Sequence, residues 1–303
     1  MKHRQLGNTG IMVSEVGFGA NTVSGVGTYG SVDEADGIAA VRRAYDLGVT
    51  FFDTAEGYSE GRSEEVLGKV LAGKQDVIIC SKVGGRARSL KPEVVREAIH
   101  GSLKRLQREV IDVYLIHNPP DDQVADPRYI DTLEELKRDG LIRTYGISLN
   151  MDTQIWQGEK ALELGGYQAL EVEFNIVLQE PEDSLLPSMA QSGVGAIIQV
   201  PLASGLLSGK YQRTSTFASS DRRALNMPKA QMDKAYEIVE KLGPLVDSEG
   251  ISLAGAAIAW VLSHPEVSTV IPGCKNALQV EQNVAAGDLT LSKSVFEAAR
   301  SLR

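Results

Sequence analysis

Residues 48–58 read Gly48-Val49-Thr50-Phe51-Phe52-Asp53-Thr54-Ala55-Glu56-Gly57-Tyr58. The apolar part is typical of a short buried strand that ends at Asp53, and Tyr58 follows soon after it. Lys82 and His117 also stand at the ends of short apolar runs. About 30 residues separate one such end from the next, which is the length of a strand, a helix and two connections. The spacing therefore predicts that three consecutive βα units bring these polar side chains to one point, as in an active site.

The charge balance limits the classes of partner. The chain has 303 residues, of which 31 are basic and 40 acidic, for a formal net charge of −9. This balance argues against nucleic acid or an anionic membrane as the main partner, so local donors have to hold any phosphorylated ligand. The N-terminal residues lack the apolar run of a signal sequence, and no segment has the apolar length of a bilayer span. We expect a cytoplasmic protein with a small-molecule substrate and leave the oligomeric state open.

The chain carries only two cysteines, Cys80 and Cys274. They lie far apart in the sequence, and Cys80 falls within an apolar run, which favours buried free thiols over a disulfide. The cysteines and histidines show no spacing typical of a metal site, so no metal is expected.

Apolar runs alternate with helical patterns from one end of the chain to the other. Eight runs predict strands: Glu15 to Ala20, Thr50 to Ala55, Val77 to Val83, Val113 to Asn118, Thr144 to Leu149, Ala169 to Asn175, Ala196 to Leu202 and Thr269 to Gly273. The helical patterns between them include Asp33 to Leu47, Ser63 to Leu71, Pro92 to Leu106, Tyr129 to Arg138, Pro228 to Leu242 and Leu253 to Leu262.

Eight such units predict an α/β fold, a (β/α)8 TIM barrel, with a doubly wound open sheet as the alternative. The start of the chain, around Asn8-Thr9-Gly10, predicts an N-terminal β-hairpin that closes the floor of the barrel, and additional C-terminal helices are expected. The polar stretch from Arg213 to Asn226 is interpreted as a mobile loop over the site. Because no linker or low-complexity segment divides the chain, residues 1–303 are expected to form a single domain.

The alternation of side chains along each strand predicts which residues point into the barrel. In such a barrel the functional residues lie on the inward face and at the rim formed by the carboxyl ends of the strands. The polar residues at the ends of the second, third and fourth runs each come last on their face. In the sixth run, Glu171, Glu173 and Asn175 share one face, an inward polar stripe that is typical of a ligand-lining surface. Ser148 ends the fifth run, and Gln199 lies opposite its apolar neighbours in the seventh.

Four segments together resemble the aldo-keto reductase family. They are residues 48–58, the run Ile111-Asp112-Val113-Tyr114-Leu115-Ile116-His117, the stretch Pro201-Leu202-Ala203-Ser204-Gly205-Leu206-Leu207-Ser208-Gly209-Lys210, and Val270-Ile271-Pro272-Gly273. The likeness spans nearly the whole chain in the right order. It implies a (β/α)8 barrel that binds NADP(H) extended across its carboxyl end, with NAD(H) as the less favoured cofactor.

The family's four catalytic positions match Asp53, Tyr58, Lys82 and His117. Reduction of a carbonyl by hydride builds negative charge on oxygen, and Tyr58 is expected to supply the proton there. A phenol has a reference pKa of about 10, and a neighbouring ammonium, here Lys82, is expected to lower it. Asp53 would pair with Lys82 and fix its position, and His117 would hydrogen-bond the carbonyl oxygen.

The resemblance implies a nicotinamide site that this chain has altered. In the family a Ser-Asn pair, a Gln and an aromatic residue hold the ring. Here Ser148 remains, but Leu149 follows it, Glu171 stands at the Gln position and Gln199 at the aromatic one. The predicted contacts at this end of the cofactor are Gly19, Ala20, Asn21, Asp53, Ser148, Glu171 and Gln199.

Glu171 leads to a hypothesis about redox direction. An ionised carboxylate beside a ring that is cationic only when oxidised favours the oxidised cofactor. The alternative is that Glu171 is protonated or paired with a nearby cation. Loss of the aromatic stacking partner leaves ring placement to other groups, Asn150 among them.

Two further loops are predicted to hold the cofactor's phosphates. The loop after the seventh strand would bind the pyrophosphate through Pro201, Leu202, Ser204, Gly205, Leu207 and Lys210. The loop and helix start after the eighth strand would bind the adenosine 2′-phosphate through Gly273, Lys275, Gln279, Gln282 and Asn283. Many family members have an arginine where this chain has Gln279, so the NADP preference depends on Lys275.

The substrate is expected to contact Asn21, Tyr29, Tyr58, His117 and Asn118. Polar substrates such as sugars or small aldehydes are favoured. The predicted function is an NADP(H)-dependent oxidoreductase that interconverts a carbonyl (aldehyde, ketone or sugar) and its alcohol by hydride transfer. The alternatives are an NADP-retaining sugar dehydrogenase or epimerase, a non-catalytic cofactor-sensing subunit, and an aldolase or isomerase in which Lys82 forms a Schiff base.

Overall fold

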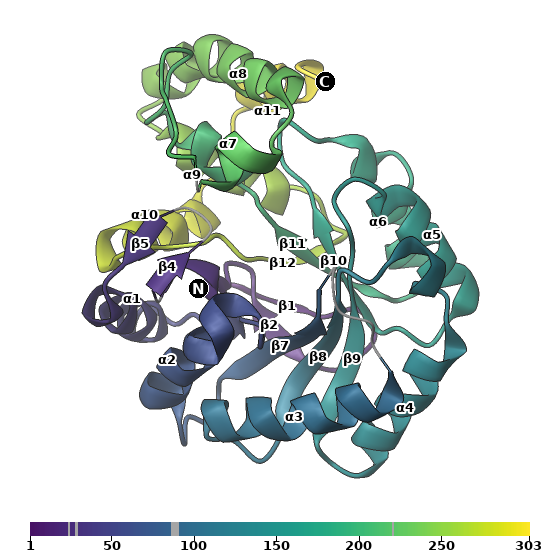
Figure 1. Ribbon diagram of the computed structural model, residues 1–303. Coiled ribbons are helices and arrows are strands. Elements are labelled where there is room, and N and C mark those ends of the chain that lie inside the picture. Colours follow the sequence, from purple (N-terminus) through teal and green to yellow (C-terminus); the bar gives the residue numbers. More distant parts are fainter. Residues whose placement is uncertain (24, 28–29, 86–90, 220) are drawn as a thin grey trace.

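Eight parallel strands form a nearly closed barrel (Figure 1). The structure is a computed structural model that describes residues 1–23, 25–27, 30–85, 91–219 and 221–303. The barrel strands are β3 (Phe18–Gly19), β6 (Phe51–Asp53), β7 (Ile78–Gly84), β8 (Ile111–His117), β9 (Ile142–Ser148), β10 (Ala169–Glu173), β11 (Gly195–Gln199) and β12 (Val267–Val270). Each strand pairs with its neighbour in chain order, and parallel bridges from Val16 to Val270 and from Gly19 to Gly273 join the first strand to the last. The (β/α)8 barrel is therefore confirmed, and the doubly wound sheet, which reverses its strand order, is wrong.

All eight predicted strands are present, but seven of them, all except β7, end one to three residues earlier than their predicted runs. Strand β10 stops at Glu173, because the side chain of Asn175 accepts hydrogen bonds from the backbone N–H of Val177 and Leu178 and so forms a turn. Strand β11 stops at Gln199, because Val200 takes a left-handed backbone with φ 53°. A β-branched residue is strained in this region. The amide of Asn175 donates to the Val200 carbonyl at 3.0 Å and helps to hold this bend in place.

Helices surround the barrel in the order expected of βα units (Figure 1). Those that follow the strands are α1 (Glu34–Asp46), α2 (Arg62–Leu71), α3 (Pro92–Leu106), α4 (Pro127–Arg138), α5 (Gln154–Leu164), α6 (Leu185–Gln191), α7 (Arg222–Asn226), α8 (Lys229–Ser248) and α9 (Leu253–Leu262). Two more, α10 (Ala277–Ala285) and α11 (Lys293–Ser301), confirm the expected C-terminal helices. Short 3-10 turns lie in the connections: η1 (Ala20–Thr22), η2 (Tyr58–Gly61), η3 (Asp121–Gln123), η4 (Glu180–Glu182), η5 (Ala203–Ser208) and η6 (Ala286–Asp288).

Helix α8 corrects one predicted boundary. The pattern predicts an end at Leu242, yet the helix continues through Pro244 to Ser248. Proline inside a helix removes one hydrogen bond and normally ends it. Here Leu242 and Val246, on either side of Pro244, are both fully buried, so packing of this face keeps the last turns helical.

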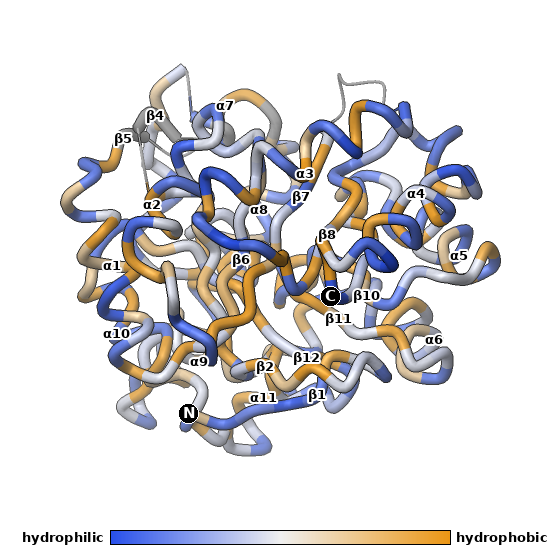
Figure 2. Tube along the Cα trace, turned by 90° about the horizontal axis from the view of Figure 1, so that it is seen from below, coloured by the Kyte–Doolittle hydropathy of each residue, from blue (hydrophilic) through white to orange (hydrophobic). Residues whose placement is uncertain are grey.

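An N-terminal hairpin closes the floor of the barrel, as predicted. Strands β1 (His3–Gln5) and β2 (Met12–Ser14) pair antiparallel. Buried side chains of the hairpin and its turn pack against the residues inside the barrel, in a cluster made up of Leu6, Ile11, Val13, Phe51, Ile78, Cys80, Val113, Leu115, Ala169, Ile197 and Ile271. Viewed from below, β1 is hydrophilic, whereas most of the central strands are hydrophobic (Figure 2). The guanidinium of Arg4 fastens β1 to the barrel by donating to the carbonyls of Leu262 and Val267 at 2.8 Å each.

Three smaller features of the fold concern a second hairpin, the two cysteines and the apolar length of the helices. A second hairpin, β4 (Gly25–Gly27) with β5 (Gly30–Val32), follows the first barrel strand. Cys80 and Cys274 are both buried free thiols, as predicted. Among the described helices, none alone has the length and apolar character of a membrane span; only the bent pair α8 and α9 passes that test together, by length and composition.

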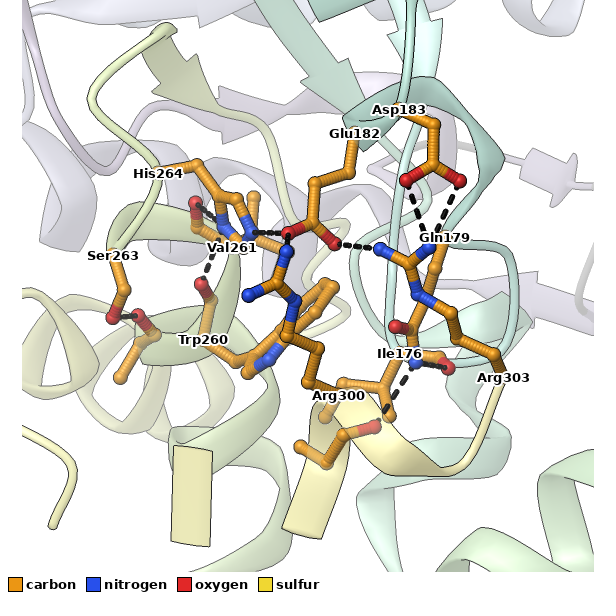
Figure 3. Close-up of polar contacts among 12 residues, drawn as sticks. Ile176, Gln179, Glu182, Asp183, Trp260, Val261, Ser263, His264, Arg300 and Arg303 are labelled. Carbon is orange, nitrogen blue, oxygen red and sulfur yellow. Dashed lines mark hydrogen bonds and ion pairs between the residues drawn. The ribbon is translucent and has the colours of Figure 1, made fainter. Parts of the chain in front are cut away.

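Ion pairs fasten the C-terminal helix to the connection after β10 (Figure 3). The carboxylate of Glu182 binds Arg300 at 2.8 Å and Arg303 at 2.7 Å, and His264 lies 3.7 Å from it. Arg303 also donates to both carboxylate oxygens of Asp183 at 2.8 Å. The carboxylate of Glu182 thus joins the connection after β10 to the last residues of the chain.

A Glu182→Gln variant is expected to lose about 1–2 kcal/mol of its free energy of unfolding, because the amide keeps the shape but not the charge that two arginines share. Urea unfolding would measure it. Asp183→Asn is the matched control: its side chain is 60% exposed against 13% for Glu182, so a change within about 0.5 kcal/mol is expected. Equal losses in both variants would contradict the central role of Glu182.

Candidate active site

Lys82 is the centre of a buried polar cluster inside the barrel. Its ammonium donates to both carboxylate oxygens of Asp53, at 2.5 and 2.6 Å, and to the carbonyl of Thr54 at 3.1 Å. The hydroxyl of Tyr58 lies 3.4 Å from the same nitrogen. Strand β7 delivers Lys82, strand β6 delivers Asp53, and the turn η2 that follows β6 delivers Tyr58. Three of the four predicted catalytic residues therefore meet around one nitrogen.

Glu171 joins this cluster from the far side of the barrel. Its Oε2 lies 3.1 Å from the Lys82 nitrogen, and its Oε1 accepts a hydrogen bond from Ser148 at 3.1 Å. Asp53, Lys82 and Glu171 are 2%, 0% and 1% exposed, so two carboxyl groups share one ammonium out of contact with water. The pairing of Glu171 with a cation, which the sequence left as an alternative, is the arrangement found.

Burial and charge act against each other on these groups. Burial raises the pKa of Glu171 to about 8, although Lys82 and the Ser148 hydroxyl pull it down. Burial also raises the pKa of Asp53, again opposed by Lys82. For Lys82, burial alone would lower the pKa, yet Asp53 and Glu171 outweigh it and hold the pKa well above its usual value. The cluster therefore contains a firmly charged ammonium and a carboxyl group that titrates near neutral pH.

The Tyr58 phenol departs from the expected direction. Burial, with help from the charges of Asp53 and Glu171, raises its pKa above the ordinary value of a phenol. Lys82 acts in the expected direction and lowers the pKa, but it does not prevail. Burial of the phenol is the largest effect and, together with Asp53 and Glu171, it outweighs the lowering by Lys82. The Tyr58 phenol is therefore protonated at neutral pH.

The backbone around Tyr58 is unusual. Ser59, Glu60 and Gly61 follow it with φ values of 50°, 57° and 87°, three successive left-handed residues. Such conformations are costly for residues other than glycine and recur at functional sites. His117, at the end of β8, is half-buried, and its ring lies edge-on to that of Tyr58 with centroids 5.7 Å apart and planes at 84°. The fourth predicted catalytic residue therefore stands beside the hydroxyl donor.

Several residues near the expected nicotinamide position make contacts within the protein itself. Leu149 is fully buried in the hydrophobic core, and its N–H donates to the Glu171 carbonyl at 3.0 Å. The side-chain amide of Asn150 donates to the Pro119 carbonyl at 2.7 Å. Gln199 is partly exposed at the end of β11. Within the predicted polar stripe, Asn175 holds the backbone of the neighbouring turns, so at least part of that stripe is structural.

The loop after β11 bends through left-handed residues. Val200, Ala203, Ser204 and Gly205 all have positive φ, and the N–H groups of Gly205 and Leu207 both donate to the Leu202 carbonyl. Pro201 and the Leu207 side chain are buried, Leu202 and Ser204 are partly exposed, and Lys210 is exposed. Two of the predicted amide donors are thus engaged within the loop itself.

Arg223 approaches this loop, although the sequence pattern does not single it out. Its guanidinium lies over the rings of Tyr211 and Phe217, at 4.5 and 4.2 Å from their centroids. It also pairs with Asp221 at 2.6 Å and donates to the Ser204 carbonyl at 3.4 Å. The stretch expected to be a mobile loop therefore contains the short helix α7 and a buried cation beside the predicted pyrophosphate loop. The only signal in the sequence is an arginine downstream of two aromatic residues.

The segment after β12 offers a helix start and one lysine. Asn276 caps α10 by accepting from the N–H of Gln279, and the Gln279 side chain accepts from the N–H of Lys275 at 2.8 Å. Asn283 is buried and donates to the sulfur of Cys274 at 3.1 Å, whereas Gln282 and Gly273 are exposed. Lys275 is half-buried, and its charge helps to lower the pKa of Asp221, after the larger effect of Arg223. Lys275 is thus near enough to Asp221 to act on its charge, and Asp221 pairs with Arg223.

The remaining predicted residues lie on or next to the same rim. Gly19 and Ala20 are buried at the end of β3, where the Ala20 carbonyl accepts from Ser63 at 2.7 Å. Asn21 is partly exposed in η1, and Asn118, with φ 46°, follows β8. The predicted substrate contact Tyr29 lies outside the described residues.

One group of side chains has the composition of a metal site. Ligand atoms of Asp53, Cys80 and Glu171 lie within 4.8 Å of one another. The ammonium of Lys82 donates hydrogen bonds to Asp53 and forms an ion pair with Glu171, so the protein supplies its own cation to both carboxyl groups. Burial raises the pKa of the Cys80 thiol well above its usual value, which keeps the sulfur neutral and a poor ligand.

Comparison with known proteins agrees with this geometry. The family model described as "Aldo/keto reductase family" matches residues 15–303. The chain is 31% identical to a "Probable voltage-gated potassium channel subunit beta" of Oryza sativa subsp. japonica, over 95% of this chain and 92% of that protein. It is 28% identical to the "NADH-specific methylglyoxal reductase" of Escherichia coli (strain K12), over 96% of this chain and 95% of that protein. Among solved structures, the glycerol dehydrogenase of Gluconobacter oxydans is similar with a TM-score of 0.82 at 25% identity, covering 99% of this chain and 94% of that one.

Proposed function

The chain belongs to the aldo/keto reductase family, and we propose that it transfers hydride between NADP(H) and a small polar carbonyl or alcohol, with Tyr58 as proton donor and acceptor. The observation that carries this proposal is the contact of the Tyr58 hydroxyl with the Lys82 ammonium at 3.4 Å, while Asp53 holds that ammonium at 2.5 Å. An acid that is positioned and polarised in this way is what carbonyl reduction requires at oxygen.

Each catalytic side chain has a separate task in the proposal. Tyr58 gives its proton to the oxygen that gains charge in reduction and takes it back in oxidation. Lys82 polarises the phenol and stabilises its phenolate form, and Asp53 fixes the ammonium in place. His117, edge-on to the Tyr58 ring, orients the substrate oxygen toward the phenol. The bound nicotinamide supplies or accepts the hydride at carbon.

The residues present fit a phosphorylated dinucleotide. Arg223, which is ion-paired with Asp221, contacts the first predicted phosphate loop at the Ser204 carbonyl, and Lys275 adds a cation at the second, in a chain whose net charge is −9. Local cations of this kind are what a phosphate ligand needs on an acidic protein. We assign the pyrophosphate to the loop from Pro201 to Lys210 and the 2′-phosphate to Lys275 and the start of α10. The preference for NADP(H) is the open part of the proposal, since one relative is described as NADH-specific.

A Lys275→Ala variant is expected to weaken NADP⁺ binding about tenfold, equivalent to about 1.4 kcal/mol, and NAD⁺ binding less than about twofold. The reason is that only the phosphorylated nucleotide places a dianion near this side chain. Titration calorimetry would measure both Kd values. Lys210→Ala, in the pyrophosphate loop, is the control and should weaken both nucleotides alike. Equal losses in Lys275→Ala would remove Lys275 from the 2′-phosphate site.

Three rival functions give different results in one set of experiments. A cofactor-sensing subunit, suggested by the likeness to the potassium channel subunit, would bind NADP(H) but turn over no carbonyl or alcohol. A retained-cofactor dehydrogenase or epimerase would copurify with NADP⁺. A Schiff-base enzyme needs a neutral, accessible amine, and the buried Lys82 with its raised pKa is neither. Borohydride with a carbonyl substrate should therefore add no mass at Lys82.

The direct test of the proposed function is turnover. Small aldehydes, hydroxyketones, polyols and sugars would be screened with NADPH and NADP⁺, and nicotinamide absorbance would follow the reaction. We expect reduction of small polar carbonyls and the reverse oxidation of their alcohols. Nucleotide binding without turnover on any substrate class would instead support the sensing subunit.

A further inference from the structure

The buried cluster around Lys82 holds more negative than positive charge when all its groups are ionised. Asp53 and Glu171 would contribute two negative charges and Lys82 one positive charge, all nearly inaccessible to solvent. An uncompensated charge in a site of low dielectric is costly, so such a cluster tends to retain a proton or to attract another cation. In the described part of the chain, Lys82 is the one cation in contact with either carboxyl group.

The neighbouring groups leave Glu171 as the site for that proton. Asp53 receives two short hydrogen bonds from Lys82, at 2.5 and 2.6 Å, whereas Glu171 lies 3.1 Å from the same nitrogen. Besides Lys82 and Asp53, the groups near Glu171 on the adjoining strands and turn are the neutral Cys80, Ser148 and the Tyr58 phenol. In the strand register, His117 lies beside Ser148, and Glu173 lies beside Gln199. The closer ammonium contact keeps Asp53 ionised, so the weaker partner of Lys82 gains and loses the proton.

The position of the nicotinamide follows from the proposed function, on which this inference rests. Hydride moves to or from the carbon whose oxygen contacts Tyr58, so the ring has to lie within van der Waals contact of that carbon. Tyr58 is 3.4 Å from Lys82, and Lys82 is 3.1 Å from Glu171. The ring is cationic only when oxidised, and it carries that charge to the edge of the buried cluster.

We propose that Glu171 is the proton store of the site: ionised beside the oxidised cofactor and protonated beside the reduced one, so that the buried site stays neutral in both states. With Glu171 ionised, the charges of Asp53, Lys82, Glu171 and the oxidised ring cancel. With Glu171 protonated, Asp53 and Lys82 cancel and the reduced ring is neutral. A glutamine at this position could not follow the change in charge.

The step balances in atoms and charge. Oxidation of an alcohol removes one hydride from carbon, which the oxidised nicotinamide accepts, and one proton from oxygen, which enters the cluster through Tyr58. Tyr58 passes a proton to Lys82 as Lys82 passes one to Glu171, over contacts of 3.4 and 3.1 Å. The C–H and O–H bonds of the alcohol break, and a C=O bond and the Glu171 O–H bond form. Reduction of a carbonyl runs the same transfers backward.

Proton release on nucleotide binding tests the proposal without turnover. Calorimetry of NADP⁺ and NADPH near pH 7, in two buffers of different ionisation enthalpy, counts the protons exchanged with the intact protein. We expect release approaching one proton per NADP⁺ bound and almost none per NADPH. The affinity for NADP⁺ should then rise with pH, by up to about tenfold per pH unit below the titration of Glu171.

Matched variants assign the proton. Glu171→Gln should abolish the release and flatten the pH dependence of the NADP⁺ Kd, and Glu171→Asp should restore both. Glu163→Gln, which changes an exposed carboxyl on α5 away from the site, should behave like the parent protein. If the parent binds NADP⁺ without releasing protons, or Glu171→Gln releases as many as the parent, the proton store is overturned while the proposed function stands. If neither nucleotide binds, both are overturned.

Discussion

A Lys82→Met variant is expected to lose about 3–5 kcal/mol of its free energy of unfolding, because it leaves two buried carboxyl groups without their cation. Methionine has a similar length, so little packing is lost. The cost comes from Asp53 and Glu171, which lie 2.5 and 3.1 Å from the ammonium that is removed. Denaturant unfolding near neutral pH would measure the loss.

A compensated variant separates charge from packing. The triple change Lys82→Met, Asp53→Asn and Glu171→Gln removes all three charges and should recover most of the lost stability, since a buried ion pair is often no better than neutral groups of the same shape. If the triple variant is as unstable as Lys82→Met alone, the loss comes from packing and the charge argument is wrong. Neither variant should catalyse hydride transfer.

Replacement of Tyr58 by phenylalanine is expected to lower kcat/KM for carbonyl reduction by about 10²- to 10⁴-fold, the usual contribution of a positioned general acid. The fold and the nucleotide Kd should change little, because within the described residues the hydroxyl makes one hydrogen bond, with the Lys82 ammonium. Steady-state kinetics with NADPH and a small aldehyde would measure the effect.

The control for Tyr58 is Tyr45→Phe, which removes a hydroxyl that donates to Asp76 at the surface. Its kcat/KM should equal that of the parent protein. A Tyr58→Phe variant within a few-fold of the parent would move the role of acid to another group, with His117 the nearest alternative. The raised pKa of Tyr58 keeps the phenol protonated at neutral pH, which is the form that donates in reduction.

The barrel could be predicted because most of its strands are apolar runs and the first seven recur at nearly regular intervals. Strand ends could not be predicted in the same way. The stop at Glu173 depends on a side chain, Asn175, that bonds its own backbone, and the stop at Gln199 depends on a strained Val200. Helix α8 likewise continues past Pro244 because buried neighbours outweigh a local preference.

In the candidate active site, too, some contacts could be predicted from the sequence and others could not. The spacing of Asp53, Lys82 and His117 along consecutive strands is visible in the sequence, since consecutive barrel strands are neighbours. The contact between Lys82 and Glu171 is not, because β8 and β9 separate their strands and the side chains meet only across the interior. The approach of Arg223 depends on the course of a long connection, which no periodic pattern describes.

The hairpin that closes the floor of the barrel sets the route by which water reaches the reaction. Leu6, Ile11 and Val13 are almost completely buried beneath the cluster, so these side chains exclude water at the floor of the barrel. If Glu171 stores a proton as proposed, that proton would have to exchange with solvent at the carboxyl end. Bound nucleotide and substrate would cover that end and prevent the exchange. A proton taken up by Glu171 during an oxidation would then remain on Glu171 until the product leaves.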